Sequence, residues 1–194
     1  KGLDWFLPIF AKVAHELPLH MRILGEGAEK ENVQKLIKKF GVTERVTFAK
    51  TESHNLPNEY SAADFLVLPS RQESWGRVVV EALQSGTPVL GTQEVGCAED
   101  LLEDGVSALI APFGDRAAMT ERLGRMATDE ALRKRLSEAG RAAVSHLGFD
   151  RTVKEMQCFW SGIDPVRGRP AAGTATAASG RPASNGIDER QSFE

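Results

Sequence analysis

The fold is decided by one stretch, residues 68–90, which reads LPSRQESWGRVVVEALQSGTPVL. It starts at the end of a short apolar run, 65–68, which has the length of a buried strand. A polar loop follows, and residues 75–83 then show the apolar spacing of a helix. Gly86 ends this helix and Pro88 prevents its continuation, which is the usual order of helix stop signals. The stretch therefore predicts a strand, a loop, a helix, a turn and the beginning of a further strand.

The same alternation recurs along the chain and predicts an α/β fold. The expected strands cover residues 20–24, 46–48, 65–68, 89–90 and 108–111. The expected helices cover residues 5–16, 32–40, 56–62, 75–83, 99–103, 115–126, 129–147 and 151–160. Strands that alternate with helices indicate a doubly wound parallel sheet with helices on both faces. In such sheets ligands bind beyond the carboxyl ends of the strands, so we expect the loops there to carry the function.

Two glutamates mark the central stretch. Glu73 lies in the loop before the predicted helix, and Glu81 lies one to two turns inside that helix. A helix start offers unpaired N–H groups and a partial positive charge, which suit an anion such as a diphosphate. Ser74 and Gly76 are small enough for a ligand to approach the backbone. The alternative is that Glu73 is a solvated loop carboxylate and Glu81 an exposed helix residue, since charged residues are mostly exposed.

The composition is that of a globular protein without a strong electrostatic preference. The chain has 194 residues, is 41% hydrophobic and carries a formal net charge of -3, so no nucleic-acid partner is predicted. Its two cysteines, Cys97 and Cys158, form no disulfide framework and fit a reducing cytoplasm. The histidines and cysteines show no metal-ligand spacing, and no apolar run has the length of a membrane span. We therefore expect a cytoplasmic protein without a metal, with the inner membrane surface as an alternative location.

Two further segments bear on the domain organisation and the site. From residue 162 on, the chain is rich in Gly, Ala, Ser, Pro and Arg and has almost no large apolar residue. This composition predicts a domain over residues 1–161 and a disordered tail over residues 162–194. The Gly25-Glu26-Gly27 segment follows a predicted strand, and both a plain tight turn and a ligand-facing loop are consistent with it.

The central stretch resembles the donor-site motif of retaining glycosyltransferases of the GT-B fold. The resemblance rests on Pro-Ser-x-x-Glu, a Gly, a second Glu after seven intervening residues, and then Ala-Leu-x-x-Gly-x-Pro-Val. Other short patterns of the same family are matched at Lys1-Gly2, Gly25-Glu26-Gly27, Gly96 with Glu99, and Asp104-Gly105. From residue 1 to about residue 160 the chain is similar to the C-terminal, donor-binding, Rossmann-like half of these enzymes.

This resemblance implies a reaction and a set of roles. The reaction moves a hexose-type sugar from a nucleotide-diphosphate sugar to an acceptor hydroxyl, with retention of configuration and with no metal or cofactor. Glu73 is then the residue at the reaction centre, where it contacts the transferred sugar, and Glu81 binds the ribose. The remaining donor-binding residues implied are Lys1 at the diphosphate, Gly25, Gly27, the backbone of Ser74, Trp75 and Gly76, and Arg77. The 51–56 loop is expected near the base.

The chain also departs from the family pattern. Ser74 and Val95 stand where the family usually has Gly. The larger departure concerns what precedes Lys1, where the family has a central strand and, before it, an N-terminal acceptor domain. We therefore expect a sheet that lacks its first strand, with the 20–24 strand separated from the region after residue 65. The acceptor, whether a glycan, a lipid or a small molecule, is not indicated.

Two other functions remain open at this stage. The first is a non-catalytic fragment or subunit that binds nucleotide sugars and needs a separate acceptor domain. The second is a nucleotide-sugar epimerase of the GT-B fold, which has no separate acceptor. A neighbouring reading frame that encodes only the acceptor half would indicate a split enzyme. An upstream in-frame extension would indicate that this sequence is a piece of a longer enzyme.

Overall fold

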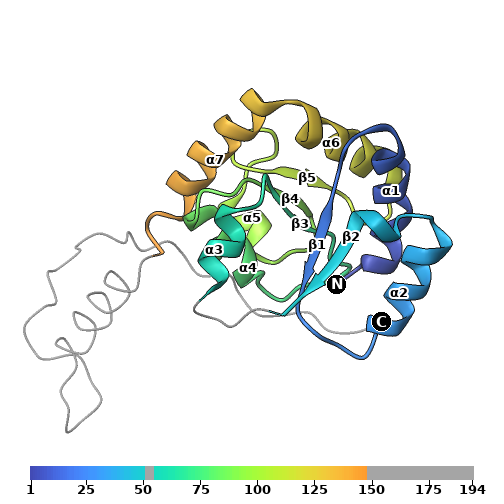
Figure 1. Cartoon of the computed structure of the whole chain (residues 1–194). Coiled ribbons are helices and arrows are strands. Elements are labelled where there is room, and N and C mark those ends of the chain that lie inside the picture. The colour runs from blue at the N-terminus through green and yellow to red at the C-terminus, as the bar shows by residue number, and fades with distance from the viewer. Residues whose placement is uncertain (51–54, 148–194) are drawn as a thin grey trace, which may run out of the picture. The chain divides into compact units, whose positions relative to one another are not determined.

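A computed structural model describes residues 1–50 and 55–147 of the chain (Figure 1). The strands are β1 (Met21–Leu24), β2 (Val46–Ala49), β3 (Leu66–Leu68), β4 (Val89–Thr92) and β5 (Leu109–Ala111). The helices are α1 (Leu3–Glu16), α2 (Lys30–Lys39), α3 (Leu56–Ser61), α4 (Arg77–Gln84), α5 (Cys97–Leu101), α6 (Arg116–Thr128) and α7 (Glu130–Val144), with a 3-10 turn, η1 (Thr43–Arg45). Strands and helices alternate, which confirms the predicted α/β class.

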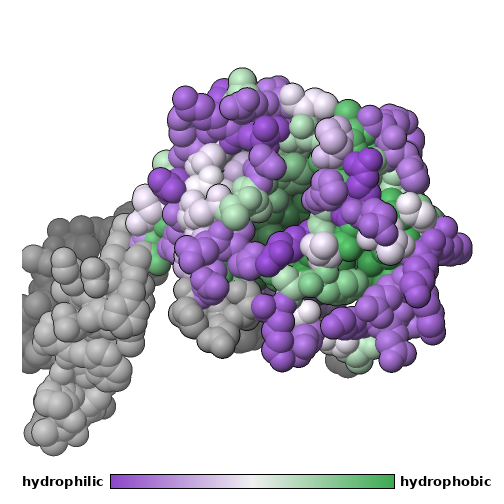
Figure 2. Space-filling model, in the orientation of Figure 1, coloured by the Kyte–Doolittle hydropathy of each residue, from purple (hydrophilic) through white to green (hydrophobic). Residues whose placement is uncertain are grey.

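All strand pairs are parallel, but they form two separate sheets. The first sheet has the order β1-β2, with Ile23 opposite Phe48, and the second has the order β3-β4-β5, with Leu90 opposite Leu109. In the part of the chain that the structure describes, no ladder joins β1 to β3, so the expected separation of these two strands is confirmed. Figure 2 shows a hollow floored by hydrophobic residues on this face, in the region where Figure 1 places β1 and β3.

The helices hold the two sheets together through a shared core. α1 packs against α2 and α6, and its Phe6, Leu7 and Phe10 are almost completely buried. The same hydrophobic cluster includes Val46 of the first sheet and Leu90 of the second, so it spans both. Burying side chains of this size stabilises the fold by about 1.5–3 kcal/mol each, which explains how two unjoined sheets share one compact unit. None of the described helices combines the length and the apolar character needed to cross a membrane.

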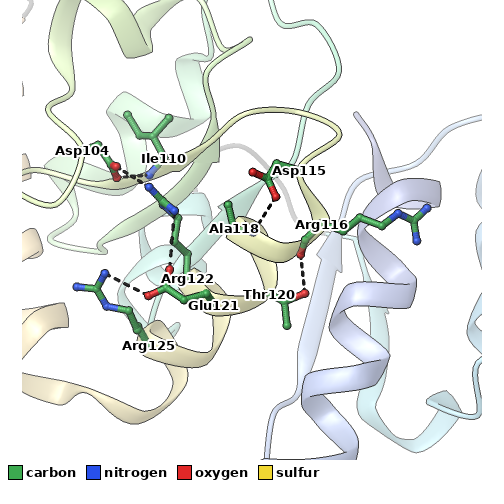
Figure 3. Close-up of polar contacts among 9 residues, drawn as sticks. All are labelled: Asp104, Ile110, Asp115, Arg116, Ala118, Thr120, Glu121, Arg122 and Arg125. Carbon is green, nitrogen blue, oxygen red and sulfur yellow. Dashed lines mark hydrogen bonds and ion pairs between the residues drawn. The ribbon is translucent and has the colours of Figure 1, made fainter.

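Two aspartates begin the last two helices as the sequence predicts. The Asp115 side chain accepts a hydrogen bond from the backbone N–H of Ala118 at 2.9 Å, and Asp129 accepts one from Leu132 at 2.8 Å. A carboxylate in this position satisfies a helix N–H that has no partner within the helix. Figure 3 shows the Asp115 cap and also the ion pair between Arg122 and Asp104, which measures 2.7 Å. Asp104 also accepts from the N–H of Ile110, which fixes the predicted Asp104-Gly105 turn against β5.

Several predicted boundaries are wrong by a few residues. The central helix begins at Arg77 rather than at Trp75, because Gly76 has a left-handed backbone with φ of 95° and serves as the N-cap. α5 begins at Cys97 rather than at Glu99, and α7 ends at Val144 rather than at residue 147. The η1 turn was not predicted. The expected helix over residues 151–160 and the expected tail over 162–194 lie outside the described residues.

Candidate functional site

The loop that carries Glu73 follows β3 and is fixed by main-chain hydrogen bonds to the loop after β4. The N–H of Glu73 donates to the carbonyl of Glu94 at 3.1 Å, and the N–H of Gly96 donates back to the carbonyl of Glu73 at 2.9 Å. The N–H of Cys97 donates to the carbonyl of Trp75 at 2.7 Å. These bonds place Glu73 at the carboxyl edge of the second sheet, next to the start of α4. This is the edge where parallel sheets bind ligands.

The close approach of these two loops requires glycine at two positions. A Cβ on Gly96 would collide with the carbonyl oxygen of Ser74. A Cβ on Gly76 would lie 2.5 Å from Val95 Cγ1, and its φ of 95° is rarely adopted by other residues. Val95 is only 2% exposed, so it fills the space beneath the loop. Val95 is therefore part of the packing that supports the Glu73 loop.

Glu73 forms an ion pair with Lys1, so two residues 72 positions apart meet at this edge. Gly2 makes this possible, because a Cβ there would collide with the carbonyl of Pro69 and its φ is 74°. The Glu73 side chain is 19% exposed and that of Lys1 is 63% exposed. The carboxylate is thus held at a partly buried position, and the ammonium approaches it from the solvent side.

Glu81 lies on α4 and has two partners. The Tyr60 hydroxyl, from α3, donates to Glu81 Oε2 at 2.9 Å, and Arg77 Nε pairs with Glu81 Oε1 at 2.9 Å. Tyr60 is 6% exposed. Burial raises the pKa of Tyr60 above its ordinary value, and the neighbouring Glu81 carboxylate raises it further. The hydroxyl therefore stays protonated and remains a donor. The sequence did not single out Tyr60, because no local pattern links it to a residue 21 positions away.

A pocket of 590 Å³ opens beside this carboxylate. Its volume lies within the range of about 300–1,000 Å³ that small-molecule sites occupy. The lining residues are Leu56, Pro57, Tyr60, Arg77, Glu81, Gln84 and Ser85. The lining thus combines the apolar side chains of Leu56 and Pro57 with the Glu81 carboxylate and its two partners, Tyr60 and Arg77. The 51–54 part of the loop expected near the base lies outside the described residues.

The structure brings together some of the predicted site residues and leaves others apart. Ser74 and Trp75 lie in the loop between Glu73 and α4, and the Trp75 side chain is 44% exposed. Gly25 and Gly27 end β1 in the other sheet, and both are exposed. A Cβ on either would meet nothing within 4 Å. The Gly25 N–H donates to the Ala49 carbonyl at 3.3 Å and Glu26 pairs with Lys50, so this turn is joined to the end of β2.

Cys97 is a buried free thiol beneath the Glu73 loop. Burial raises the pKa of Cys97 to about 11, and the negative charges of Glu73 and Asp100 contribute in the same direction. The thiol is therefore protonated at neutral pH and is not a nucleophile. Across residues 1–50 and 55–147, His, Cys, Asp and Glu side chains form no group of three or more that could hold a metal ion.

These parallel sheets and covering helices are the Rossmann-like architecture of GT-B glycosyltransferases. The family model for "Glycosyl transferases group 1" matches residues 1–143, and the chain belongs to this family.

Three similar proteins illustrate the match. The chain is 32% identical over 135 residues to the lipopolysaccharide core biosynthesis glycosyltransferase LpsE of Rhizobium meliloti (strain 1021), covering 70% of this chain and 39% of that protein. It is 34% identical over 134 residues to a D-inositol 3-phosphate glycosyltransferase of Salinispora tropica, and the match covers 68% of this chain and 28% of that protein. Its structure is similar to that of sucrose-phosphate synthase of Thermosynechococcus elongatus, with a TM-score of 0.71 and 26% identity. This match covers 80% of this chain and 41% of the synthase. The chain thus spans less than half the length of these proteins.

Proposed function

We propose that this chain is the donor-binding half of a retaining glycosyltransferase, which moves a hexose-type sugar from a nucleotide-diphosphate sugar to an acceptor hydroxyl. One observation carries the proposal: Glu73 lies in the loop just before the start of α4, where it pairs with Lys1, and Glu81 lies inside the same helix beside a pocket. A donor has a sugar, a diphosphate and a nucleoside in a row. Two carboxylates that can accept hydrogen bonds, one before a helix N-terminus and one within the helix, match the order of sugar, diphosphate and nucleoside.

The diphosphate is the leaving group and becomes more negative as its bond to the sugar breaks. The start of α4 has no side chain that caps its first N–H groups, so these are available to phosphate oxygens. Lys1 brings a cation to the same edge. Charges aimed at a group that becomes more negative stabilise the transition state more than the ground state, which is the condition for catalysis. In this proposal Glu73, Ser74, Trp75 and Gly76 lie along the sugar and phosphates.

The nucleoside end of the donor is assigned to the pocket beside Glu81. Ribose hydroxyls are donors, and a carboxylate accepts them strongly. Leu56 and Pro57 offer an apolar wall to the base. Gly25 and Gly27, which follow β1 of the other sheet, complete the proposed donor-binding set. The location proposed for this reaction is the cytoplasm, because the chain has two cysteines and no disulfide framework.

We further propose that the acceptor-binding part of the enzyme lies outside these 194 residues. The matched region covers only 39% and 28% of two relatives, so most of each relative lies outside it. We therefore expect the 194 residues, expressed alone, to be poorly soluble and to show no transfer. Adding upstream sequence, where the natural protein has it, is expected to restore both. A cooperative unfolding transition together with transfer by the isolated 194 residues would contradict this part of the proposal.

The function is tested by incubating the full natural protein with UDP-, GDP- and ADP-hexoses and with a panel of glycan, lipid and small-molecule acceptors. The expected result is release of one nucleoside diphosphate, with a product that keeps the anomeric configuration of the donor by NMR. An inverted product would contradict retention. Conversion of the donor sugar to its epimer, with no acceptor consumed, would identify an epimerase instead. Nucleotide binding without any turnover would identify a non-catalytic binding subunit.

A further inference from the structure

The two oxygens of the Glu81 carboxylate have partners of different character. Oε2 accepts from Tyr60, which is 6% exposed and is itself fixed, because its carbonyl accepts from the Thr87 hydroxyl at 2.8 Å. Thr87 is 2% exposed. Oε1 pairs with Arg77, whose side chain is 85% exposed. One partner is therefore held rigidly in the protein interior, and the other is free to leave towards solvent.

Arg77 is placed against the local electrostatics of its helix. It is the first residue of α4, where the helix dipole disfavours a cation. It also precedes Glu81 by four residues, which is the less favourable order for such a pair. An exposed pair of this kind contributes little to stability. A negatively charged ligand beside Glu81 would give this cation a more favourable partner than the helix does.

We propose that Tyr60 is a positioning residue that fixes Glu81, and that Arg77 is an exchangeable counter-ion of the same carboxylate. Arg77 pairs with Oε1 in the structure. When a nucleoside diphosphate binds, Arg77 moves to the diphosphate and Oε1 accepts the ribose hydroxyls, while Tyr60 stays on Oε2. The guanidinium suits this exchange, because it binds phosphate and carboxylate in the same bidentate manner. This inference rests on the proposed function, since it assumes that Glu81 faces the ribose.

The positioning role is tested with Tyr60→Phe in the full natural protein by calorimetry. The probes are UDP, GDP and ADP, followed by the 2′,3′-dideoxy analogue of the one that binds. We expect the wild type to prefer the ribose form by about 10-fold to 100-fold, which is the effect of losing hydrogen bonds to a charged group. Tyr60→Phe is expected to reduce this preference at least fivefold. Thr87→Val is the matched control, because it loosens Tyr60 but keeps the bond to Glu81.

An unchanged preference in Tyr60→Phe overturns the positioning role. An equal loss of preference in Thr87→Val also overturns it, since the effect would then come from general loosening of α3. Failure of the wild type to prefer the ribose form, or to bind any of the three nucleotides, refutes the proposed function itself and this inference with it. The two failures are therefore distinguishable.

The exchange is tested by measuring the affinity of Arg77→Met for the nucleoside and for the nucleoside diphosphate. The nucleoside is expected to bind about two- to fivefold more tightly, because no ion pair has to open. The diphosphate is expected to bind about three- to tenfold more weakly, because a phosphate contact is lost. Arg125→Met is the matched control, since Arg125 forms an exposed pair four residues from Glu121 on α6. Equal weakening of both ligands, or no change in either, overturns the exchange.

Discussion

Glu73 and Glu81 are eight residues apart, yet the protein holds them in different ways. Glu73 is positioned by the main chain, through hydrogen bonds that join its loop to residues Glu94 and Gly96. Glu81 is positioned by side chains, through Tyr60 and Arg77. The first arrangement depends on how closely two loops pack, and the second depends on single contacts. We therefore expect the two glutamates to respond differently to substitution, the first in turnover and the second in affinity.

The largest effect is expected for Glu73→Gln. This change keeps the shape of the side chain but removes its charge at the proposed reaction centre, so turnover should fall by about 100-fold or more. The melting temperature should stay close to that of the wild type, because the main-chain bonds of the loop are kept. Steady-state kinetics and thermal unfolding of the full natural protein measure both. Glu31→Gln, at an exposed position of α2, is the control. Near-normal turnover of Glu73→Gln would contradict the placement of Glu73 at the reaction centre.

The next effect concerns the packing that positions Glu73. Gly96→Ala adds a methyl group that collides with the Ser74 carbonyl, so the protein should lose about 1–3 kcal/mol of unfolding free energy. Turnover should fall as well, because the Glu73 loop has to move. Gly124→Ala in α6 meets nothing within 4 Å and should stabilise the protein by about 0.5–1 kcal/mol. If both variants behave alike in denaturant unfolding, loop packing does not position Glu73.

Glu81→Ala tests the second arrangement. Loss of a carboxylate that accepts from ribose hydroxyls should weaken nucleotide binding by about 1–3 kcal/mol. Turnover at saturating donor should change less than it does in Glu73→Gln, since Glu81 lies away from the transferred sugar in this account. Calorimetry with the nucleoside diphosphate and kinetics with the donor separate the two quantities. An unchanged affinity would show that Glu81 is only a surface residue of α4.

The smallest effect links Glu73 to the thiol beneath it. The charge of Glu73 helps to raise the pKa of Cys97, so Glu73→Gln should lower that pKa from about 11. It should remain above the ordinary value, because burial is the larger cause. Thiolate absorbance during a pH titration, in a background where Cys158 is replaced by Ser, measures this change. A pKa that does not move, or that rises, would indicate that the Glu73 carboxylate points away from Cys97.

The local signals in the sequence were sufficient for much of the fold. Asp115 and Asp129 begin their helices as predicted, because capping depends on residues two to three positions away. The start of α4 was wrong by two residues, because the backbone of Gly76 is set by Val95 and Cys97, which are distant in sequence. The separation of β1 from β3 was predicted from the strand order that the family resemblance implies.

The site could be predicted only in part. Glu73 and Glu81 were found because the motif between them is contiguous. Their partners were not, because the Lys1–Glu73 and Tyr60–Glu81 contacts join residues 72 and 21 positions apart. Such contacts depend on how α1 and α3 dock onto the second sheet, and no periodicity along the chain encodes that docking. Tyr60 is the only tyrosine in the chain, and its place in a predicted helix gave no sign of its partner.

The central claim is that one donor molecule lies across the start of α4 between the two glutamates. A crystal structure of the full natural protein with a nucleoside diphosphate and the free sugar tests it most directly. We expect the ribose hydroxyls on Glu81, the diphosphate at the first N–H groups of α4 and near Lys1, and the sugar beside Glu73. A nucleotide bound elsewhere on the chain, or one bound in the reverse direction with its ribose at Glu73, would contradict it.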